Sequence, residues 1–268
     1  MSPKRRTPNE LGSSGARVVL LGASNLTRGI STVIETARLI LGGPLEVFAA
    51  MGHGRSYGMR SRVLVRSLPG IVESGLWDAL DTRSEAMQTF ALITDVGNDI
   101  LYGAEPEQII EWVERCIDHL GEHHARIIVT HLPMASVRRL SRWKYYAVRS
   151  ALFPSCRIGI EQALESAIEL DGRLRELIAG REIQSIETDR AWYGFDPIHV
   201  RMRYWRSAWN RILRRWHDEP KPIRAGRSLR RWAALRRAMP ERWWLLGRER
   251  QTPQPAARLP DGTTISLF

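Results

Sequence analysis

The sequence has little cysteine and no long apolar run. Its two cysteines, Cys116 and Cys156, are forty residues apart and show no C-x-x-C spacing, which argues against a disulfide scaffold and against a zinc ribbon. No stretch approaches the length of apolar sequence that spans a bilayer, and the basic first sixteen residues lack the apolar segment of a secretory signal. These absences predict a cytoplasmic protein.

Motifs for nucleotides and metals are also missing. The chain contains no G-x-x-x-x-G-K-[ST], and no G-x-G-x-x-G follows an expected strand, so no nucleotide cofactor is predicted. His119, His123 and His124 include a pair four residues apart that could bind a metal on one helix face. Because no supporting acidic or thiol ligand is evident, the sequence predicts no metal site and no other cofactor.

Excess positive charge is confined to one part of the chain. The formal net charge is +11, but residues 201–250 contain sixteen Arg or Lys against four Asp or Glu, so the remaining residues are nearly neutral. A basic patch spread over the domain would favour nucleic acid as a partner. Because the domain itself is nearly neutral, the charge distribution argues against nucleic-acid binding by the domain.

The C-terminal part of the chain differs in composition from the rest. The segment DEPKPIRAG after His217 has two prolines and a glycine and marks a domain edge. It separates a domain over 17–217 from a basic, Trp- and Arg-rich extension over 218–268. A flexible arm is predicted over 1–16. Residues 228–250 read as a helix with an apolar face and a cationic remainder, although Pro240 should interrupt it. Such a helix packs on the domain, docks on an anionic membrane surface or binds an acidic partner. The last residues are expected to form a loose tail.

Five short apolar or β-rich runs alternate with helical segments. Because strands separated by amphipathic helices form parallel sheets covered on both faces, the sequence predicts an α/β protein, a three-layer α/β/α sandwich with a mainly parallel five-stranded sheet. The expected strands are 17–22, 45–50, 90–95, 126–131 and 182–187.

Polar residues with chemical potential follow these strands, where ligands of α/β sheets collect. Gly-Ala-Ser-Asn, containing Ser24, comes after the first strand, and Gly-His-Gly, ending at Gly54, comes after the second. Asn98 and Asp99 close a Val-Gly-Asn-Asp block after the third strand, and Asp-Pro-Ile-His runs from Asp196 to His199.

These four blocks, in this order, resemble those of the SGNH (GDSL-like) hydrolase family over about residues 17–216. The resemblance implies a flavodoxin-like fold and a cofactor-free serine esterase acting on small acyl esters. It implies Ser24 as nucleophile, His199 as base and Asp196 as the carboxylate that orients the imidazole. It also implies an oxyanion hole formed by the backbone N–H groups of Ser24 and Gly54 and the side-chain amide of Asn98.

Two positions depart from the family pattern. Ala23 replaces the usual acidic residue before the serine, and Val96 replaces the first glycine of the third block. A β-branched residue resists positive φ, so the loop geometry beside Ser24 and Asn98 is expected to differ. Two alternatives to the esterase remain. One is a protein with weak or degenerate catalytic activity that binds or scaffolds through its basic extension, and the other is an acyltransferase that uses the same triad.

A second serine competes for the nucleophile's role. Gly54-Arg55-Ser56-Tyr57-Gly58 fits the G-x-S-x-G nucleophile elbow, but only one strand precedes LEVFAA and no H-G-G-G-type oxyanion loop is present. We therefore predict that Ser56 is not the nucleophile. The residues predicted to line the substrate pocket are His53, Arg55, Tyr57 and Trp192. Substrate identity and oligomeric state are left open.

Overall fold

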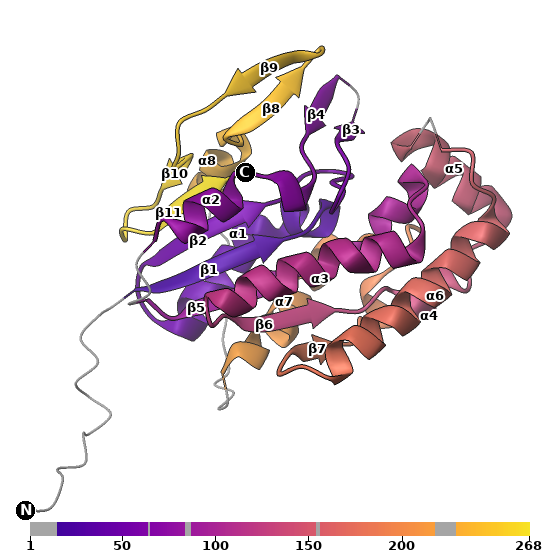
Figure 1. Ribbon diagram of the computed structural model, residues 1–268, viewed down its shortest axis with the longest axis horizontal. Helices are drawn as coiled ribbons and strands as arrows, with labels where there is room; N and C mark the ends of the chain where they lie inside the picture. The colour runs from indigo at the N-terminus through magenta and orange to yellow at the C-terminus, as the bar shows by residue number, and fades with distance from the viewer. Residues whose placement is uncertain (1–14, 64, 84–86, 154–155, 218–228) are drawn as a thin grey trace, which may run out of the picture.

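The computed structural model describes residues 15–63, 65–83, 87–153, 156–217 and 229–268. These residues form three layers, with a central sheet between two layers of helices (Figure 1). The N-terminal arm predicted over 1–16 lies almost entirely outside the described residues. The predicted α/β/α sandwich is confirmed.

The central sheet has seven strands in the order β10-β11-β2-β1-β5-β6-β7. All neighbouring strands pair in parallel except β10 and β11. The strands are β1 (Ala16–Leu21), β2 (Leu45–Ala50), β5 (Thr89–Ile93), β6 (Arg126–Thr130), β7 (Gln184–Ile186), β10 (Ala257–Arg258) and β11 (Thr264–Leu267). The first five match the predicted strands, and β1 and β5 are buried along their whole length, as their continuous apolar runs require.

The prediction of five strands is wrong by two, because the C-terminal residues are not a loose tail. Strand β11 pairs in parallel with β2, and Ile265 and Leu267 are buried in the core. At the start of β2 the Leu45 N–H donates to the Thr263 hydroxyl across 218 positions of sequence. A four-residue strand carries little periodicity of its own, and its partner is remote, so no local pattern indicated it.

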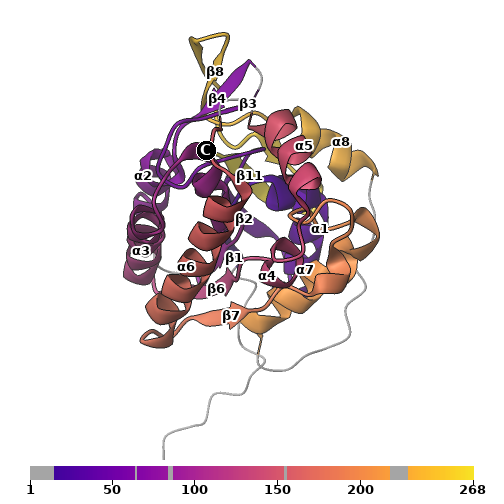
Figure 2. The ribbon, with the colours of Figure 1, turned by 90° about the vertical axis from the view of Figure 1, so that its right-hand side faces the viewer.

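Helices cover the two faces of the sheet (Figure 2). Side chains of α1, α7 and α8 form one core and those of α2, α3 and α6 the other. The helices are α1 (Ser24–Leu41), α2 (Leu76–Asp81), α3 (Pro106–Glu122), α4 (Met134–Val137), α5 (Arg142–Leu152), α6 (Ile160–Ala179), α7 (Trp205–Leu213) and α8 (Leu229–Arg237), with 3₁₀ turns η1 (Ile71–Glu73), η2 (Val96–Tyr102), η3 (Arg190–Trp192), η4 (Met202–Tyr204) and η5 (Arg214–Trp216). Within the described ranges, none of these helices is long and apolar enough to cross a membrane.

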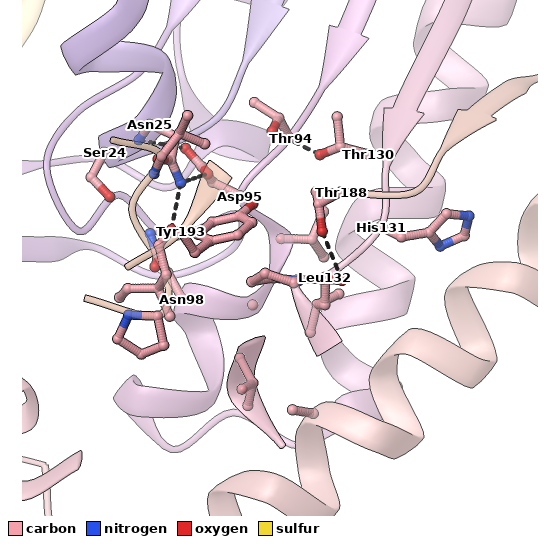
Figure 3. A pocket seen from close by; sticks show the side chains of 18 of the residues that line it. Ser24, Asn25, Thr94, Asp95, Asn98, Thr130, His131, Leu132, Thr188 and Tyr193 are labelled. Atoms are coloured by element: carbon pink, nitrogen blue, oxygen red, sulfur yellow. Dashed lines mark hydrogen bonds between the residues drawn. The ribbon is translucent and has the colours of Figure 1, made fainter. Parts of the chain in front are cut away.

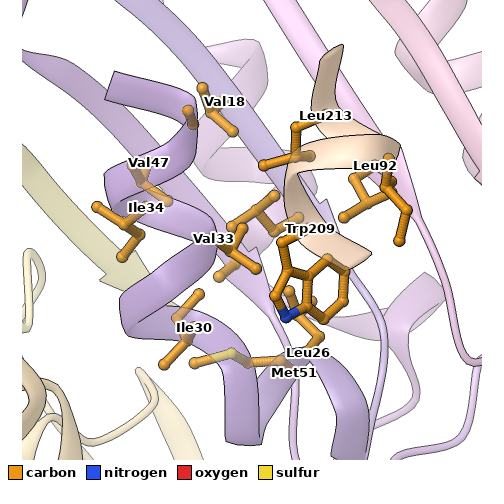
Figure 4. Packing of buried hydrophobic residues seen from close by; sticks show 14 of the residues in the cluster. Val18, Leu26, Ile30, Val33, Ile34, Val47, Met51, Leu92, Trp209 and Leu213 are labelled. Atoms are coloured by element: carbon orange, nitrogen blue, oxygen red, sulfur yellow. The ribbon is translucent and has the colours of Figure 1, made fainter. Parts of the chain in front are cut away.

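The contact between α1 and α7 fixes the helix that begins at Ser24. The Trp209 ring of α7 lies against α1, among Leu26, Ile30 and Val33 (Figure 4). Gly29 permits this approach, because an added Cβ there would lie 2.2 Å from Trp209 Nε1. Close packing of this kind holds α1 in a single position on the sheet.

A second, four-stranded antiparallel sheet joins the loop after β2 to the C-terminal region. Its strands, in the order β3-β4-β8-β9, are β3 (Ser61–Val63), β4 (Arg66–Leu68), β8 (Arg242–Leu245) and β9 (Arg248–Gln251). The prediction of a helix over 228–250 is therefore wrong beyond α8. Residues 242–245 form strand β8, which pairs with β4. The Arg60 guanidinium lies over the Trp244 ring of this strand, with its central carbon 3.6 Å from the ring centroid.

Candidate active site

Ser24 and His199 are in direct hydrogen-bond contact although 175 positions separate them. Ser24 is the first residue of α1, immediately beyond the carboxyl end of β1. His199 Nε2 lies 2.7 Å from Ser24 Oγ, and His199 Nδ1 lies 2.5 Å from Asp196 Oδ2. The His199 side chain is only 5% exposed. The structure thus places hydroxyl, imidazole and carboxylate in one continuous chain of hydrogen bonds.

The loop that carries His199 is held by its own aspartate. Asp196 Oδ1 accepts the backbone N–H groups of Ile198 and His199, each at 3.2 Å. Burial is the largest single influence on the Asp196 pKa and raises it, but the hydrogen bonds from the His199 ring and from the backbone together leave that pKa below its usual value. The carboxylate therefore stays ionised and orients the imidazole.

Asn25 ties the serine helix to this loop. Its side-chain amide donates to the Ile198 carbonyl at 2.8 Å, and its side-chain oxygen accepts the Val200 N–H at 2.8 Å. Both bonds flank His199 in the chain. Asn25 is not among the predicted site residues, because no local pattern links it to a loop more than 170 positions along the chain.

Asp95 caps α1 from the neighbouring strand end. Its Oδ2 accepts the N–H groups of Ala23 and Asn25 at 3.0 Å and of Leu26 at 3.3 Å, and its Oδ1 accepts the Asn25 amide at 2.8 Å. A carboxylate at a helix N-terminus satisfies free N–H groups and interacts favourably with the helix dipole. Asp95 therefore supplies the negative charge that Ala23 cannot.

Asp95 also explains how Val96, the second departure from the family pattern, is accommodated. The positive φ of this turn falls on Asp95, at 61°, and not on Val96. Aspartate tolerates this left-handed conformation better than a β-branched residue does, so Val96 is accommodated as a buried apolar side chain. The expected distortion at Val96 is absent from this described turn.

The backbone around Ser24 leaves one N–H group without an acceptor. Asp95 takes the N–H groups on both sides of it, at Ala23 and Asn25. No described residue accepts a hydrogen bond from the Ser24 N–H itself. This donor is therefore available to a ligand bound at Ser24.

Gly54 and Asn98 belong to two loops that contact each other. Gly54 has φ of 61°, and its carbonyl accepts the Tyr102 hydroxyl at 2.6 Å. The Asn98 amide lies 3.5 Å from the Arg55 carbonyl, and Asn98 and Ser24 line the same cavity (Figure 3). A Cβ at Gly54 would lie 3.1 Å from the Tyr102 hydroxyl oxygen, so glycine suits this position on grounds of conformation and of space.

Ser56 is a buried structural partner of Asp99. It has no exposed surface, its hydroxyl donates to the Asp99 carboxylate, and it accepts the Met59 N–H at 2.7 Å. Asp99 also accepts the Tyr57 N–H. Burial raises the pKa of Asp99 to about 6 despite these hydrogen bonds. Ser56 thus anchors the loop that follows β2, and no histidine is among its hydrogen-bond partners.

Three of the four predicted pocket residues do not line the cavity beside Ser24. Arg55 is fully buried, donates to the Met51 and Phe268 carbonyls, and has its pKa lowered to about 9 by burial. Tyr57 is fully buried and donates to the Thr94 carbonyl at 2.8 Å. His53 is exposed and lines a separate cavity beside α8. The prediction is thus wrong for these three, while Trp192 does line the cavity.

A cavity of about 160 Å³ opens beside Ser24, between the sheet end and helices α4 and α6 (Figure 3). Most of its lining is apolar. The apolar lining residues contributed by η2, β6 and its following loop, α4 and α6 include Val96, Ile100, Leu101, Leu132, Pro133, Val137, Ile160, Ala163 and Leu164. The arrangement offers an apolar group room next to the Ser24 hydroxyl.

Comparison with known proteins supports the fold. No protein-family model matches the chain, and no curated protein matches it. One solved structure is 12% identical over 76% of this chain and 97% of its own, with a TM-score of 0.51. Others are a lipolytic protein of the G-D-S-L family from Veillonella parvula DSM 2008 (12% identity, 71% and 93% coverage, TM-score 0.46) and the psychrotrophic esterase EstA from Pseudoalteromonas sp. (9% identity, 74% and 97% coverage, TM-score 0.46).

Likeness at these identities concerns the fold alone.

Proposed function

We propose that this protein, which has an SGNH-like hydrolase fold, is a serine esterase that cleaves carboxylic esters through an acyl-enzyme on Ser24. The observation that carries the proposal is the hydrogen-bonded series from Ser24 Oγ through His199 to Asp196. A serine hydroxyl is a weak nucleophile and needs an adjacent base. His199 is within reach of the proton that must be removed, and Asp196 holds its other nitrogen.

The first half-reaction transfers the acyl group. As Ser24 Oγ attacks the ester carbonyl, its proton moves to His199 Nε2, and the carbonyl oxygen becomes an oxyanion. His199 then gives the proton to the departing alcohol oxygen, the ester C–O bond breaks, and the acyl group remains on Ser24. In the second half-reaction His199 takes a proton from water, which attacks the acyl-enzyme, and the carboxylic acid leaves as Ser24 regains its proton.

The oxyanion hole of the proposal consists of three donors. The Ser24 N–H, which has no acceptor among the described residues, is joined by the Gly54 N–H and the Asn98 amide. The Gly54 loop is held by Tyr102 and, through Ser56, by buried Asp99. Donors fixed in this way stabilise developing negative charge without reorganisation, typically by about 3 kcal/mol for each donor.

The apolar cavity gives the proposal its substrate class. A cavity of about 150 Å³ lined by aliphatic and aromatic side chains can hold a benzene-sized group, and the cavity beside Ser24 has nearly the same volume. We assign it to the acyl part of the substrate. The preferred esters then carry a short apolar acyl group of about six carbon atoms.

Labelling with a fluorophosphonate probe tests the nucleophile. Wild type is expected to become labelled, Ser24→Ala to remain unlabelled, and Ser207→Ala, which changes an exposed serine of α7, to label as wild type does. Ser56→Ala is expected to label as long as it folds. Loss of label only in Ser56→Ala would transfer the nucleophile's role to that residue. Absence of label in folded wild type, together with no hydrolysis of p-nitrophenyl acetate or hexanoate, would contradict the proposal.

A further inference from the structure

Two histidines and an aspartate converge on one point far along the chain from Ser24. His119 Nε2 and His123 Nε2 each lie 2.9 Å from Asp81 Oδ1. The ligand atoms of the three residues all lie within 4.8 Å of one another. Asp81 is the last residue of α2, whereas the histidines are at the end of α3, so the acidic ligand missing from the local sequence comes from another helix.

We propose that Asp81, His119 and His123 form a binding site for a divalent transition-metal ion of the Zn²⁺, Co²⁺ or Ni²⁺ class. Imidazole nitrogen suits these ions, whereas Mg²⁺ and Ca²⁺ prefer sites made of oxygen ligands. Histidines four residues apart project from the same helix face and can bind one ion together.

The donor atoms are close to the spacing that such an ion requires. Each Nε2 lies 2.9 Å from Asp81 Oδ1, which is a hydrogen-bond distance, so the three side chains are slightly closer together than the ligands of a bound ion. A tetrahedral arrangement needs a separation of about 3.3 Å. The Asp81 side chain is 51% exposed at a helix end, so a small rotation provides this opening.

The two imidazoles are already oriented. The His119 ring stacks on the Trp77 ring with centroids 4.7 Å apart, and it lies nearly parallel to the His123 ring, at 8°. Trp77 is itself fixed, because its indole N–H donates to the Ile71 carbonyl at 2.9 Å. Ligands held in this way lose little rotamer freedom on binding an ion.

The electrostatic surroundings favour a cation. Glu122 Oε2 lies 4.0 Å from His119 Nε2, adding a second carboxylate beside Asp81. Exposed Glu122 thus adds negative charge beside the three proposed ligands.

The location makes the site structural and separates it from ester cleavage. Helix α3 begins after η2, on the side of the sheet where Ser24 lies, and ends just before β6 starts at Arg126. The C-terminal end of α3 therefore lies near the amino ends of the parallel strands, whereas Ser24 lies at their carboxyl ends. The hydrogen bonds from Asp81 to His119 and His123 link the end of α2 to the end of α3, so a bound ion joins α2 to α3 and stabilises the folded state by mass action.

The test uses the full-length chain without an affinity tag and stripped with EDTA. Isothermal titration with ZnCl₂ is expected to show one ion per chain, and each of His119→Gln, His123→Gln and Asp81→Asn is expected to weaken binding at least about tenfold. His124→Gln is the matched control, because His124 is exposed and stands beside His123 outside the cluster. Co²⁺ added to the same proteins reports the coordination geometry through its visible absorption bands.

Thermal unfolding gives a second readout that does not depend on activity. Zn²⁺ is expected to raise the melting temperature of wild type, His124→Gln and Ser24→Ala, and to leave that of His123→Gln unchanged. The inference is overturned if folded wild type binds neither Zn²⁺ nor Co²⁺ at millimolar concentration, or if binding is equal in all the variants. Retention by Ser24→Ala keeps this result separate from the fate of the proposed esterase.

Discussion

The side chains of Asp95 and Asn25 are joined by a 2.8 Å hydrogen bond that couples the loop after β5 to helix α1, which begins at Ser24. Through it, the carboxylate that caps α1 also holds the residue that bridges to the His199 loop. We therefore expect Asp95 to position Ser24 and His199 relative to each other, because its hydrogen bonds go to Ala23, Asn25 and Leu26, which adjoin Ser24, and Asn25 in turn holds the His199 loop.

Replacing Asp95 should lower kcat strongly and the free energy of unfolding only slightly. Asp95→Ala removes the cap, which typically costs about 1 kcal/mol of stability, and it releases the alignment of Ser24 with His199, for which about a hundredfold loss of kcat is expected. Asp95→Asn retains one acceptor and should recover part of the rate. Asp189→Ala, which removes a capping carboxylate from η3, is the control. Equal kcat in Asp95→Ala and Asp189→Ala would exclude the positioning role.

Ester cleavage should require ionised Asp196 and neutral His199. Because the Asp196 pKa is lowered, this carboxylate remains charged down to acidic pH, and the fall of kcat/KM on acidification should follow protonation of His199. Asp196→Asn leaves the shape of the site intact but removes the orienting charge, so kcat should fall by about 10³- to 10⁴-fold. A pH-rate profile that stays flat through the acidic range would rule out His199 as the base.

Buried Asp99 should make stability depend on pH in a recognisable direction. Its folded-state pKa of about 6 exceeds the ordinary value of 3.8, so the folded state binds the proton more tightly. Its contribution is complete below pH 4 and is lost as the pH rises through 6, a change of about 3 kcal/mol for a shift of about two pKa values.

Substitution isolates this contribution. Asp99→Asn cannot titrate, so the wild-type free energy of unfolding should fall relative to that of Asp99→Asn between pH 4 and 7, as measured by urea denaturation. A difference that is independent of pH would show that folding does not shift the pKa of Asp99.

Two glycines in helices should respond oppositely to alanine. Gly29→Ala places a Cβ 2.2 Å from buried Trp209 Nε1, and overpacking of this kind costs about 1 to 3 kcal/mol. Gly121→Ala, at a site in α3 where a Cβ meets no described atom within 4 Å, should stabilise by up to about 1 kcal/mol through helix propensity. Urea denaturation of both variants checks the pair, and equal effects would mean that α1 and α7 are less closely packed than described.

Filling the cavity should change the preferred acyl length. Ala163 of α6 lines the cavity, so Ala163→Phe should lower kcat/KM for p-nitrophenyl hexanoate about tenfold or more while sparing the acetate. Ala179→Phe is the control, since Ala179 is exposed at the end of the same helix. Parallel losses on both esters in Ala163→Phe would indicate that the acyl group does not enter this cavity.

The sequence by itself determined the frame of the protein. Continuous apolar runs and amphipathic spacing identified five of the seven strands of the central sheet and the main helices, because these signals are local and strong. The order of polar blocks after the strands also singled out Ser24, Asn98, Asp196 and His199, since the strand ends of a parallel sheet meet at one edge. Ser24 and His199 are indeed in contact.

Only the tertiary structure decided what depends on remote pairing. Strand β11 forms because β2 offers an unpaired edge, and β8 forms because β4 lies beside it; neither partner is visible in a local window. The exposure of Arg55 and Tyr57 was misjudged because polarity alone does not reveal that a loop folds inward onto buried acceptors. The cap at Asp95 and the contact of Asp81 with His119 and His123 likewise each join elements far apart in sequence, and such contacts are fixed by packing rather than by spacing along the chain.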